Sequence, residues 1–216
     1  MTVSTHAPQI ETKERLLEAA GMVFAERGFR EATIREICRM AGANIAAVNY
    51  YFGDKERLYA EALQYGARMA LERFPPDEGL ADGAPPEEAL YAFVRSFLRR
   101  FLESGQPEWH GRLCAREMVE PSAALDALVR EIVVPLSARV SGIARALLGP
   151  KATDTQVRLC AMSVVGQCLL YHHHRPVLDR LYGASVSSPQ DITRLARHIT
   201  AFSLGAIRAP RDSKGS

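Results

Sequence analysis

The stretch TIREICRMAGANIAAVNYYFGDKERLY (residues 33–59) contains two short helical patterns joined by a turn. Thr33 can cap the first helix, and Glu36 three residues later completes a capping-box pattern. Asn44 can cap the second helix. A short turn containing Gly42 between two such helices predicts a helix-turn-helix, whose second helix lies in the major groove of DNA. The alternative is a plain hairpin of two helices in an all-helical protein.

The second of these helices carries more aromatic side chains than one buried stripe can hold. Val48 and Phe52 are four residues apart and can pack inward. The outward positions, which we expect to face base edges, are Ile45, Ala46, Ala47, Asn49 and Tyr50. Methyl groups suit the thymine methyl, and an asparagine can bond bidentately to adenine. The exposed aromatics are explained if their partner is a nucleic acid.

Three residues are placed to meet the phosphate backbone of such a partner. Tyr51 can offer its hydroxyl, and Thr33 can hold a second phosphate together with the N–H groups at its helix start. Lys55, at the start of the next helix, can reach a third. Residues 1–60 contain eight Lys/Arg and eight Asp/Glu, so the region is neutral overall. We therefore expect modest non-specific affinity and a shallow salt dependence per subunit.

Composition restricts the class of protein. The 216 residues are 47% hydrophobic and 24% charged, which is typical of a globular chain with one large or two small domains. The net charge of +2 makes no case by itself for nucleic acid or membrane. The cysteines lack metal-site spacing and the first residues lack an apolar signal, which predicts reduced thiols in a cytoplasmic protein. No window has the roughly 18 apolar residues of a membrane helix. Without a P-loop, GxSxG or HExxH motif, we expect no enzyme.

Helical patterning continues along nearly the whole chain, so the expected fold is all-α. The first helix is expected to start at Thr12 and end at Gly28, and Asp54 is expected to cap a fourth helix. Proline residues predict kinks in two later helices, at Pro135 and near Pro176. Loops are expected at 75–86, 104–108, 149–153 and 183–189, where Pro, Gly, Ser and Asp dominate.

The segment from residue 12 to residue 59 resembles the TetR family of bacterial transcriptional regulators. The resemblance rests on a Gly-Phe before Thr33, the I..I...AG spacing, the aromatic run and the lysine after Gly-Asp. GANIAAVNYYFG, REMVEPSAALD and VVPLSARV resemble its CecR-like branch. The resemblance implies an N-terminal three-helix bundle with the helix-turn-helix (10–56), a larger C-terminal helical ligand-binding and dimerisation domain (57–208) and a disordered tail (209–216).

The same resemblance implies a homodimer that binds a palindromic double-stranded DNA operator and releases it when a small-molecule effector binds. It assigns the five outward residues above to base edges, and it assigns Thr33, Arg35, Tyr51 and Lys55 to phosphates. Many members carry Tyr at the position of Asn49 and Thr at that of Ala47. The operator sequence of a relative therefore does not transfer to this chain. The DNA-binding state and the released state must differ in their affinity for the effector. A ligand shifts a conformational equilibrium only if it binds one of the two states more tightly.

In the resembled family the last two long helices pair with their twins in a four-helix bundle. We expect a dimer seam here because operator half-sites about 34–36 Å apart need two linked subunits. The expected seam residues are Ala161, Val165, Leu169, Ala196, Ile199 and Phe202. The alternative is that these faces pack inside one subunit.

An effector pocket is expected where apolar walls meet a few polar groups. The candidate residues are Phe97, Phe101, Trp109, His110, Cys114, Glu117, Met118, Gln167 and Tyr171. An aromatic stripe at helical spacing can equally be plain core. The run His172–His174 points in three directions on a helix, so these residues cannot jointly hold one ion, although His172 with Cys168 could form half a site. We expect no metal site, and we expect no cofactor. A metal- or thiol-sensing regulator that uses Cys114, Cys160 or Cys168 remains the alternative, with a helical-bundle enzyme behind it.

Overall fold

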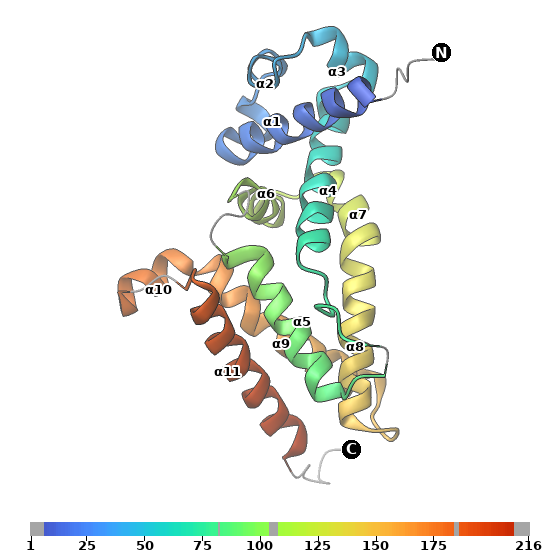
Figure 1. Ribbon diagram of the computed structural model, residues 1–216, viewed down its shortest axis with the longest axis vertical. Coiled ribbons are helices and arrows are strands. Elements are labelled where there is room, and N and C mark those ends of the chain that lie inside the picture. Colours follow the sequence, from blue (N-terminus) through green and yellow to red (C-terminus); the bar gives the residue numbers. More distant parts are fainter. Residues whose placement is uncertain (1–6, 82, 104–107, 184–185, 210–216) are drawn as a thin grey trace. The chain divides into compact units, whose positions relative to one another are not determined.

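The computed structural model describes residues 7–81, 83–103, 108–183 and 186–209 (Figure 1). Within those residues every regular element is a helix, which confirms the expected all-α fold. The helices are α1 (Ala7–Glu31), α2 (Ile34–Ala41), α3 (Ile45–Tyr51), α4 (Lys55–Arg73), α5 (Pro86–Leu102), α6 (Glu108–Val119), α7 (Ala124–Leu128), the π-helical turn η1 (Val129–Val133), α8 (Val134–Leu148), α9 (Asp154–His173), α10 (Arg175–Tyr182) and α11 (Pro189–Arg208). None of the described helices is long and apolar enough to cross a membrane.

The first compact unit contains α1 to α3, α4 through Glu72, and α6, α7 and η1. Helix α1 packs against both α2 and α6 (Figure 1). Its core is apolar and fully buried, with Phe24, Ile37, Leu58 and Leu113 among the largest side chains. This core holds α3 through Val48 and Phe52, which are both buried as their spacing predicts.

Side-chain caps define the helices of this unit where the sequence predicts them. The Thr33 hydroxyl accepts a hydrogen bond from the Glu36 N–H at 3.2 Å, and the Asn44 side chain accepts one from the Ala47 N–H at 2.8 Å. The Asp54 side chain accepts a hydrogen bond from the Arg57 N–H in the first turn of α4, at 2.8 Å. Gly42 ends α2 in the left-handed region at φ 63°, a conformation that costs glycine little.

The expectation for the first helix was wrong at its start and accurate about its break. The helix already includes Ala7, so Thr12 lies inside it and is not its cap. Helical geometry breaks at Gly28, where φ is 78°, although a further turn runs on to Glu31. The capping box predicted for α2 forms by half, since the Glu36 carboxylate pairs with Arg27 at 2.9 Å instead.

The second compact unit begins at Arg73 and contains α5 and α8 to α11. Helix α5 packs against α8, α9 and α11, and α9 also contacts α8 and α11 (Figure 1). Phe93, Leu98, Ile192 and Ile199 are fully buried where these helices meet. The unit is therefore a helical bundle with α5 at its centre.

Both expected kinks exist as breaks in helical geometry. The π-helical turn η1 ends two residues before Pro135, whose missing N–H cannot bond to the carbonyl four residues earlier. A non-helical His174 separates α9 from α10, with Pro176 in the first turn of α10. The expected disordered tail from residue 210 and the expected loop at residues 104–107 lie outside the described residues.

The compact units do not follow the expected division at residue 56. The first unit extends through most of α4 and also takes α6, α7 and η1, which the sequence places beyond the first domain. The physical reason is that α6 buries its side chains against α1 and α4, in the core described above. The boundary at Val133 coincides with the end of the π-helical turn.

Candidate nucleic-acid interface and effector region

Helix α3 presents the face that the sequence predicts. Ile45, Ala46, Asn49 and Tyr50 are exposed, and Tyr50 retains 74% of its accessible surface. Ala47 differs, because it is half-buried and packs on the core of the first unit. The helix therefore offers a small apolar residue, an amide and an aromatic ring on one outward surface, which is a surface chemistry able to read base edges.

The four residues that are expected to contact phosphates lie around α3 and differ in how exposed they are. Thr33 is exposed, and its hydroxyl accepts from the helix backbone while its own proton stays available to a further acceptor. Arg35 is exposed. Tyr51 is half-buried, with its ring packed edge-on against Tyr50 at 5.0 Å. Lys55 is also half-buried.

The Lys55 ammonium group lies 4.7 Å from the centre of the Phe29 ring and donates to the Arg30 carbonyl oxygen at 3.2 Å. It thereby holds the end of α1 beside the start of α4. An ammonium group has three donors, so this position remains compatible with a phosphate contact.

Ion pairing occupies acidic side chains in and beside residues 1–60, the stretch that carries no net charge. Glu36 pairs with Arg27 at 2.9 Å, and Glu61 pairs with Lys13 at 2.8 Å. The exposed Arg35 and Arg39 form no ion pair with any described residue. The neutral sum therefore conceals two unpaired cations on α2, and such cations can neutralise phosphates.

The nine expected effector residues are divided between the two units. Trp109, His110, Cys114, Glu117 and Met118 lie on α6 in the first unit, whereas Phe97, Phe101, Gln167 and Tyr171 lie on α5 and α9 in the second. They do not form one cluster within either unit.

Three of the α6 residues need correction. The Trp109 ring fills the space between α1 and α4: a Cβ atom added at Gly21 would lie 2.4 Å from it, and one at Gly66 would lie 2.7 Å from it. The ring is therefore core on both sides. Met118 is exposed. Glu117 is fully buried, but both of its carboxylate oxygens already accept hydrogen bonds within the same unit.

The donors to Glu117 come from Tyr59 and Ser122. The Tyr59 hydroxyl donates at 2.7 Å, the Ser122 N–H at 2.7 Å and the Ser122 hydroxyl at 2.9 Å. The neighbouring Cys114 Sγ lies 3.6 Å from the His110 Nε2. Burial raises the pKa of the Cys114 thiol to about 12, so this thiol is protonated and weakly reactive at neutral pH.

The four expected effector residues of the second unit combine aromatic and polar groups, as ligand sites do. The Phe97 and Phe101 rings are 5.2 Å apart, and the His172 ring lies 4.6 Å from Phe101. Gln167 donates to the Ser203 hydroxyl at 3.2 Å. Tyr171 packs on the core of the bundle. The sequence prediction omitted Arg100, which is buried beside Phe97; a charged residue on the apolar stripe of α5 was the available signal.

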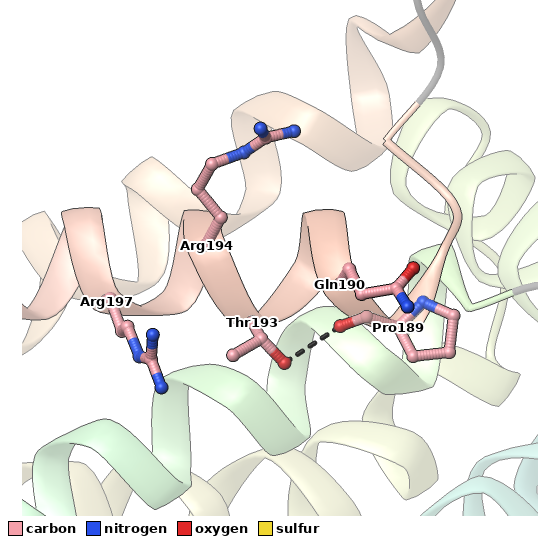
Figure 2. Close-up of a pocket in the computed structure, with 5 residues that line it drawn as sticks. All are labelled: Pro189, Gln190, Thr193, Arg194 and Arg197. Carbon is pink, nitrogen blue, oxygen red and sulfur yellow. Dashed lines mark hydrogen bonds between the residues drawn. The ribbon is translucent and has the colours of Figure 1, made fainter.

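A surface pocket at the start of α11 contains none of the expected effector residues. It is lined by Pro189, Gln190, Thr193, Arg194 and Arg197. Figure 2 shows Arg194 and Arg197 pointing to different sides of the helix, and the Thr193 hydroxyl donating to the Pro189 carbonyl at 2.8 Å. The two guanidinium groups therefore do not converge on one ligand.

The expected dimer seam also needs correction. Ala161, Ala196 and Ile199 are buried inside their own subunit, so they have no surface left for a partner. Val165 and Leu169 are half-buried in the same core. Phe202 alone stays prominent, with 63% of its surface exposed. The exposed apolar residues of α9 lie on its other side, at Leu159, Met162 and Leu170.

The described residues contain no group of three or more His, Cys, Asp or Glu that could hold a metal ion. The His172 and His173 rings lie 4.9 Å apart and are tilted by 53° to each other. Burial raises the pKa of the Cys168 thiol to about 12, which leaves it protonated at neutral pH. A buried, protonated thiol is weakly reactive, which disfavours thiol sensing at Cys114 and Cys168.

Two sequence families match the chain. Residues 16–62 match the family described as bacterial regulatory proteins, tetR family. Residues 86–207 match the C-terminal domain of the HTH-type transcriptional dual regulator CecR. CecR from Shigella flexneri is 31% identical over 169 residues, which cover 74% of this chain and 75% of CecR. The transcriptional repressor NicS from Pseudomonas putida is 22% identical over 211 residues, covering 91% and 92% of the two chains.

A solved structure has the same fold. A TetR-like transcriptional regulator from Rhodococcus sp. RHA1 superposes with a TM-score of 0.63 and 22% identity, covering 90% of this chain and 96% of that one. Together with α3 and its exposed face, these matches identify a regulator and not an enzyme. The protein belongs to the TetR family of DNA-binding transcriptional regulators and carries a CecR-type C-terminal domain.

Proposed function

We propose that this protein is a repressor that binds a palindromic operator as a homodimer and releases it when a small molecule binds the second unit. The observation that carries the proposal is the outward face of α3, where Ile45, Ala46, Asn49 and Tyr50 remain exposed on a helix fixed by buried Val48 and Phe52. Thr33, Arg35, Tyr51 and Lys55 then contact phosphates on either side of the groove.

The dimer is supported by apolar surface that one subunit leaves uncovered. Helix α9 buries Val157, Val164 and Cys168 inside the bundle, and on its other side it exposes Leu159, Met162 and Leu170. Phe202 of α11 is exposed as well. A Cβ atom added at Gly166 or Gly205 meets nothing within 4 Å, so a partner helix could approach closely there. We infer that the same surface of a second subunit covers these residues, because the resulting dimer links two α3 helices.

Release of the operator requires coupling between the two units. Helix α4 is the continuous element that follows the helix-turn-helix and ends at Arg73, where the second unit begins. An effector that binds the protein more tightly when α4 is in one position than when it is in another shifts the population of DNA-binding dimers. An effector with equal affinity for the free and the operator-bound protein would exclude this mechanism.

The first test is a mobility-shift titration of the purified protein with DNA from upstream of its own gene. We expect a sharp shift that survives excess unrelated DNA, with a stoichiometry of two chains per site. Binding to genomic fragments elsewhere would move the target but keep the DNA-binding role. A protein that shifts no DNA at any salt concentration would contradict the proposal, since the phosphate contacts alone give some affinity at low salt.

A further inference from the structure

Arg100 carries a buried positive charge that no carboxylate of the protein neutralises. Its side chain is 4% exposed, and none of the described Asp or Glu residues forms an ion pair with it. The nearby carboxylates are occupied: Glu78 pairs with Arg95 at 2.9 Å and with Arg99 at 3.4 Å, and Glu103 pairs with Arg99 at 2.6 Å. A buried charge without a partner is costly, so such a group is commonly retained for a function.

The two terminal nitrogens of Arg100 have different roles. Nη1 donates to the Phe74 carbonyl oxygen at 3.1 Å and to the Ser96 hydroxyl oxygen at 2.5 Å. The Ser96 hydroxyl in turn donates to the same Phe74 carbonyl at 2.8 Å. Nη2 is buried and has no hydrogen-bond partner among the described residues. One half of the guanidinium group is therefore fully used, and the other half still has two N–H donors to give.

The side chains around Arg100 are mostly aromatic, and Glu78 acts on it through space without forming an ion pair with it. The centre of the guanidinium group lies 5.4 Å from the centre of the Phe97 ring, and the Phe101 and His172 rings continue from Phe97 in tilted contacts. The Cys168 thiol interacts electrostatically with Arg100, and burial raises the pKa of this thiol to about 12. Burial also lowers the pKa of Arg100 to about 10, which still leaves it protonated at neutral pH. A cation thus faces a protonated thiol and aromatic rings.

We propose that the effector is a small monocarboxylate with an apolar body, and that its carboxylate pairs with Nη2 of Arg100 while its body lies against Phe97 and Phe101. A single negative charge matches the buried charge of Arg100, whereas a dianion would bury a second unpaired charge. This inference rests on the proposed function and names the chemistry of its effector.

The position of Phe74 gives this contact a consequence for DNA binding. Phe74 is the first residue after α4, and Arg100 and Ser96 of α5 both hold its carbonyl. A carboxylate is a stronger acceptor for a guanidinium group than a backbone carbonyl is. A bound carboxylate therefore competes for the guanidinium group and weakens its bond to Phe74. The end of α4 is released from α5, and the coupling required above starts at this residue.

The test compares hexanoate, phenylacetate and naphthylacetate with their primary amides, which have the same shape without the charge. Binding is read as the shift in melting temperature of the full-length protein and by calorimetry. We expect at least one carboxylate to bind the wild type, and its amide to bind at least about tenfold more weakly, because a hydrogen bond to a charged group is lost. Arg100→Gln abolishes the difference between acid and amide, and Arg100→Lys, which keeps the charge, retains part of it.

Arg99→Gln is the matched control, because the neighbouring Arg99 already has Glu103 and Glu78 as partners. It should bind the carboxylate as the wild type does, and circular dichroism checks that each variant is folded. The proposal is overturned if none of the three carboxylates binds, if acid and amide bind equally, or if Arg100→Gln keeps the preference.

The operator titration separates this inference from the function on which it rests. Wild-type protein that binds its operator but ignores all three carboxylates keeps its role as a DNA-binding regulator and loses this effector class. If the protein binds a carboxylate through Arg100 but binds no DNA, the effector site is supported and the role as a repressor is excluded. Carboxylate that binds without weakening the operator complex would exclude the Phe74 coupling.

Discussion

The hydroxyl of Tyr59 in α4 donates a buried hydrogen bond to the carboxylate of Glu117 in α6 at 2.7 Å. This bond joins two helices through residues that are 58 positions apart in the sequence, inside the same compact unit. It lies in a cluster where the Tyr59 ring packs edge-on against Phe24 and Phe29, at 5.0 and 5.3 Å. The polar contact therefore fixes how α6 meets α4 within an otherwise apolar core.

Replacement of Tyr59 by Phe tests that bond. We expect a loss of about 1–2 kcal/mol in the free energy of unfolding, because Glu117 keeps the two donors of Ser122 but loses the third. Urea titrations of wild type and Tyr59→Phe at neutral pH measure the difference. A variant as stable as the wild type would mean that the hydrogen bond contributes nothing net.

The same residue gives stability a dependence on alkaline pH. Burial, and then the hydrogen bond to Glu117, raise the pKa of Tyr59, so the folded protein holds this proton more tightly than the unfolded chain does. The resulting stability is complete below the unfolded-state pKa of about 10 and is lost as pH rises towards the raised folded-state pKa. The stability advantage of wild type over Tyr59→Phe should therefore shrink between pH 9 and about pH 11. An advantage that stays constant over this interval would contradict the assignment.

Addition of one methyl group at Gly21 should lower the stability of the protein. The added Cβ would lie 2.4 Å from the Trp109 ring, so either the ring or α1 must move. We expect Gly21→Ala to destabilise the protein by about 1–3 kcal/mol, as overpacking does. Gly142→Ala in α8 is the matched control, since nothing lies within 4 Å of its added Cβ. It should be neutral or stabilise by up to about 1 kcal/mol, because alanine favours the helix; equal losses in the two variants would argue against the close packing at Trp109.

Tyr50 provides the sharpest test of the DNA interface. Its side chain is 74% exposed, so Tyr50→Ala should leave the melting temperature unchanged while operator affinity falls by at least about tenfold. Tyr182→Ala is matched in residue type and in exposure, at 76%, but lies on α10, and should bind the operator as the wild type does. Fluorescence anisotropy with labelled operator measures all three proteins. Equal affinities would remove Tyr50 from the interface.

Phe202 tests the proposed dimer surface. An aspartate there would place an unpaired charge between two apolar helices, so Phe202→Asp should weaken dimerisation by about a hundredfold or more. Leu181→Asp, at an equally exposed apolar residue of α10, should leave the association unchanged. Sedimentation equilibrium of both variants beside the wild type gives the dissociation constants. A Phe202→Asp protein that remains a dimer would place the seam elsewhere.

The sequence by itself determined the local structure of the DNA-binding helices. Capping at Thr33, Asn44 and Asp54 depends on a side chain and a backbone N–H that are at most three residues apart. Helical spacing likewise placed Val48 and Phe52 inside and Tyr50 outside. These features are local, and so a single sequence contains all the information that they need.

Only the tertiary structure decided which partner each apolar face meets. Helix α9 is apolar on both sides, so its spacing did not reveal that Ala161 faces the core while Leu159 and Met162 face outward. The same holds for α6, whose Trp109 packs against two glycines that lie 88 and 43 positions earlier in the chain. The charge of Arg100 is visible in the sequence, but its lack of a carboxylate partner depends on how α5 folds against Phe74 and against Cys168 of α9. Long-range packing of this kind depends on the sum of many contacts, which no short pattern of residues specifies.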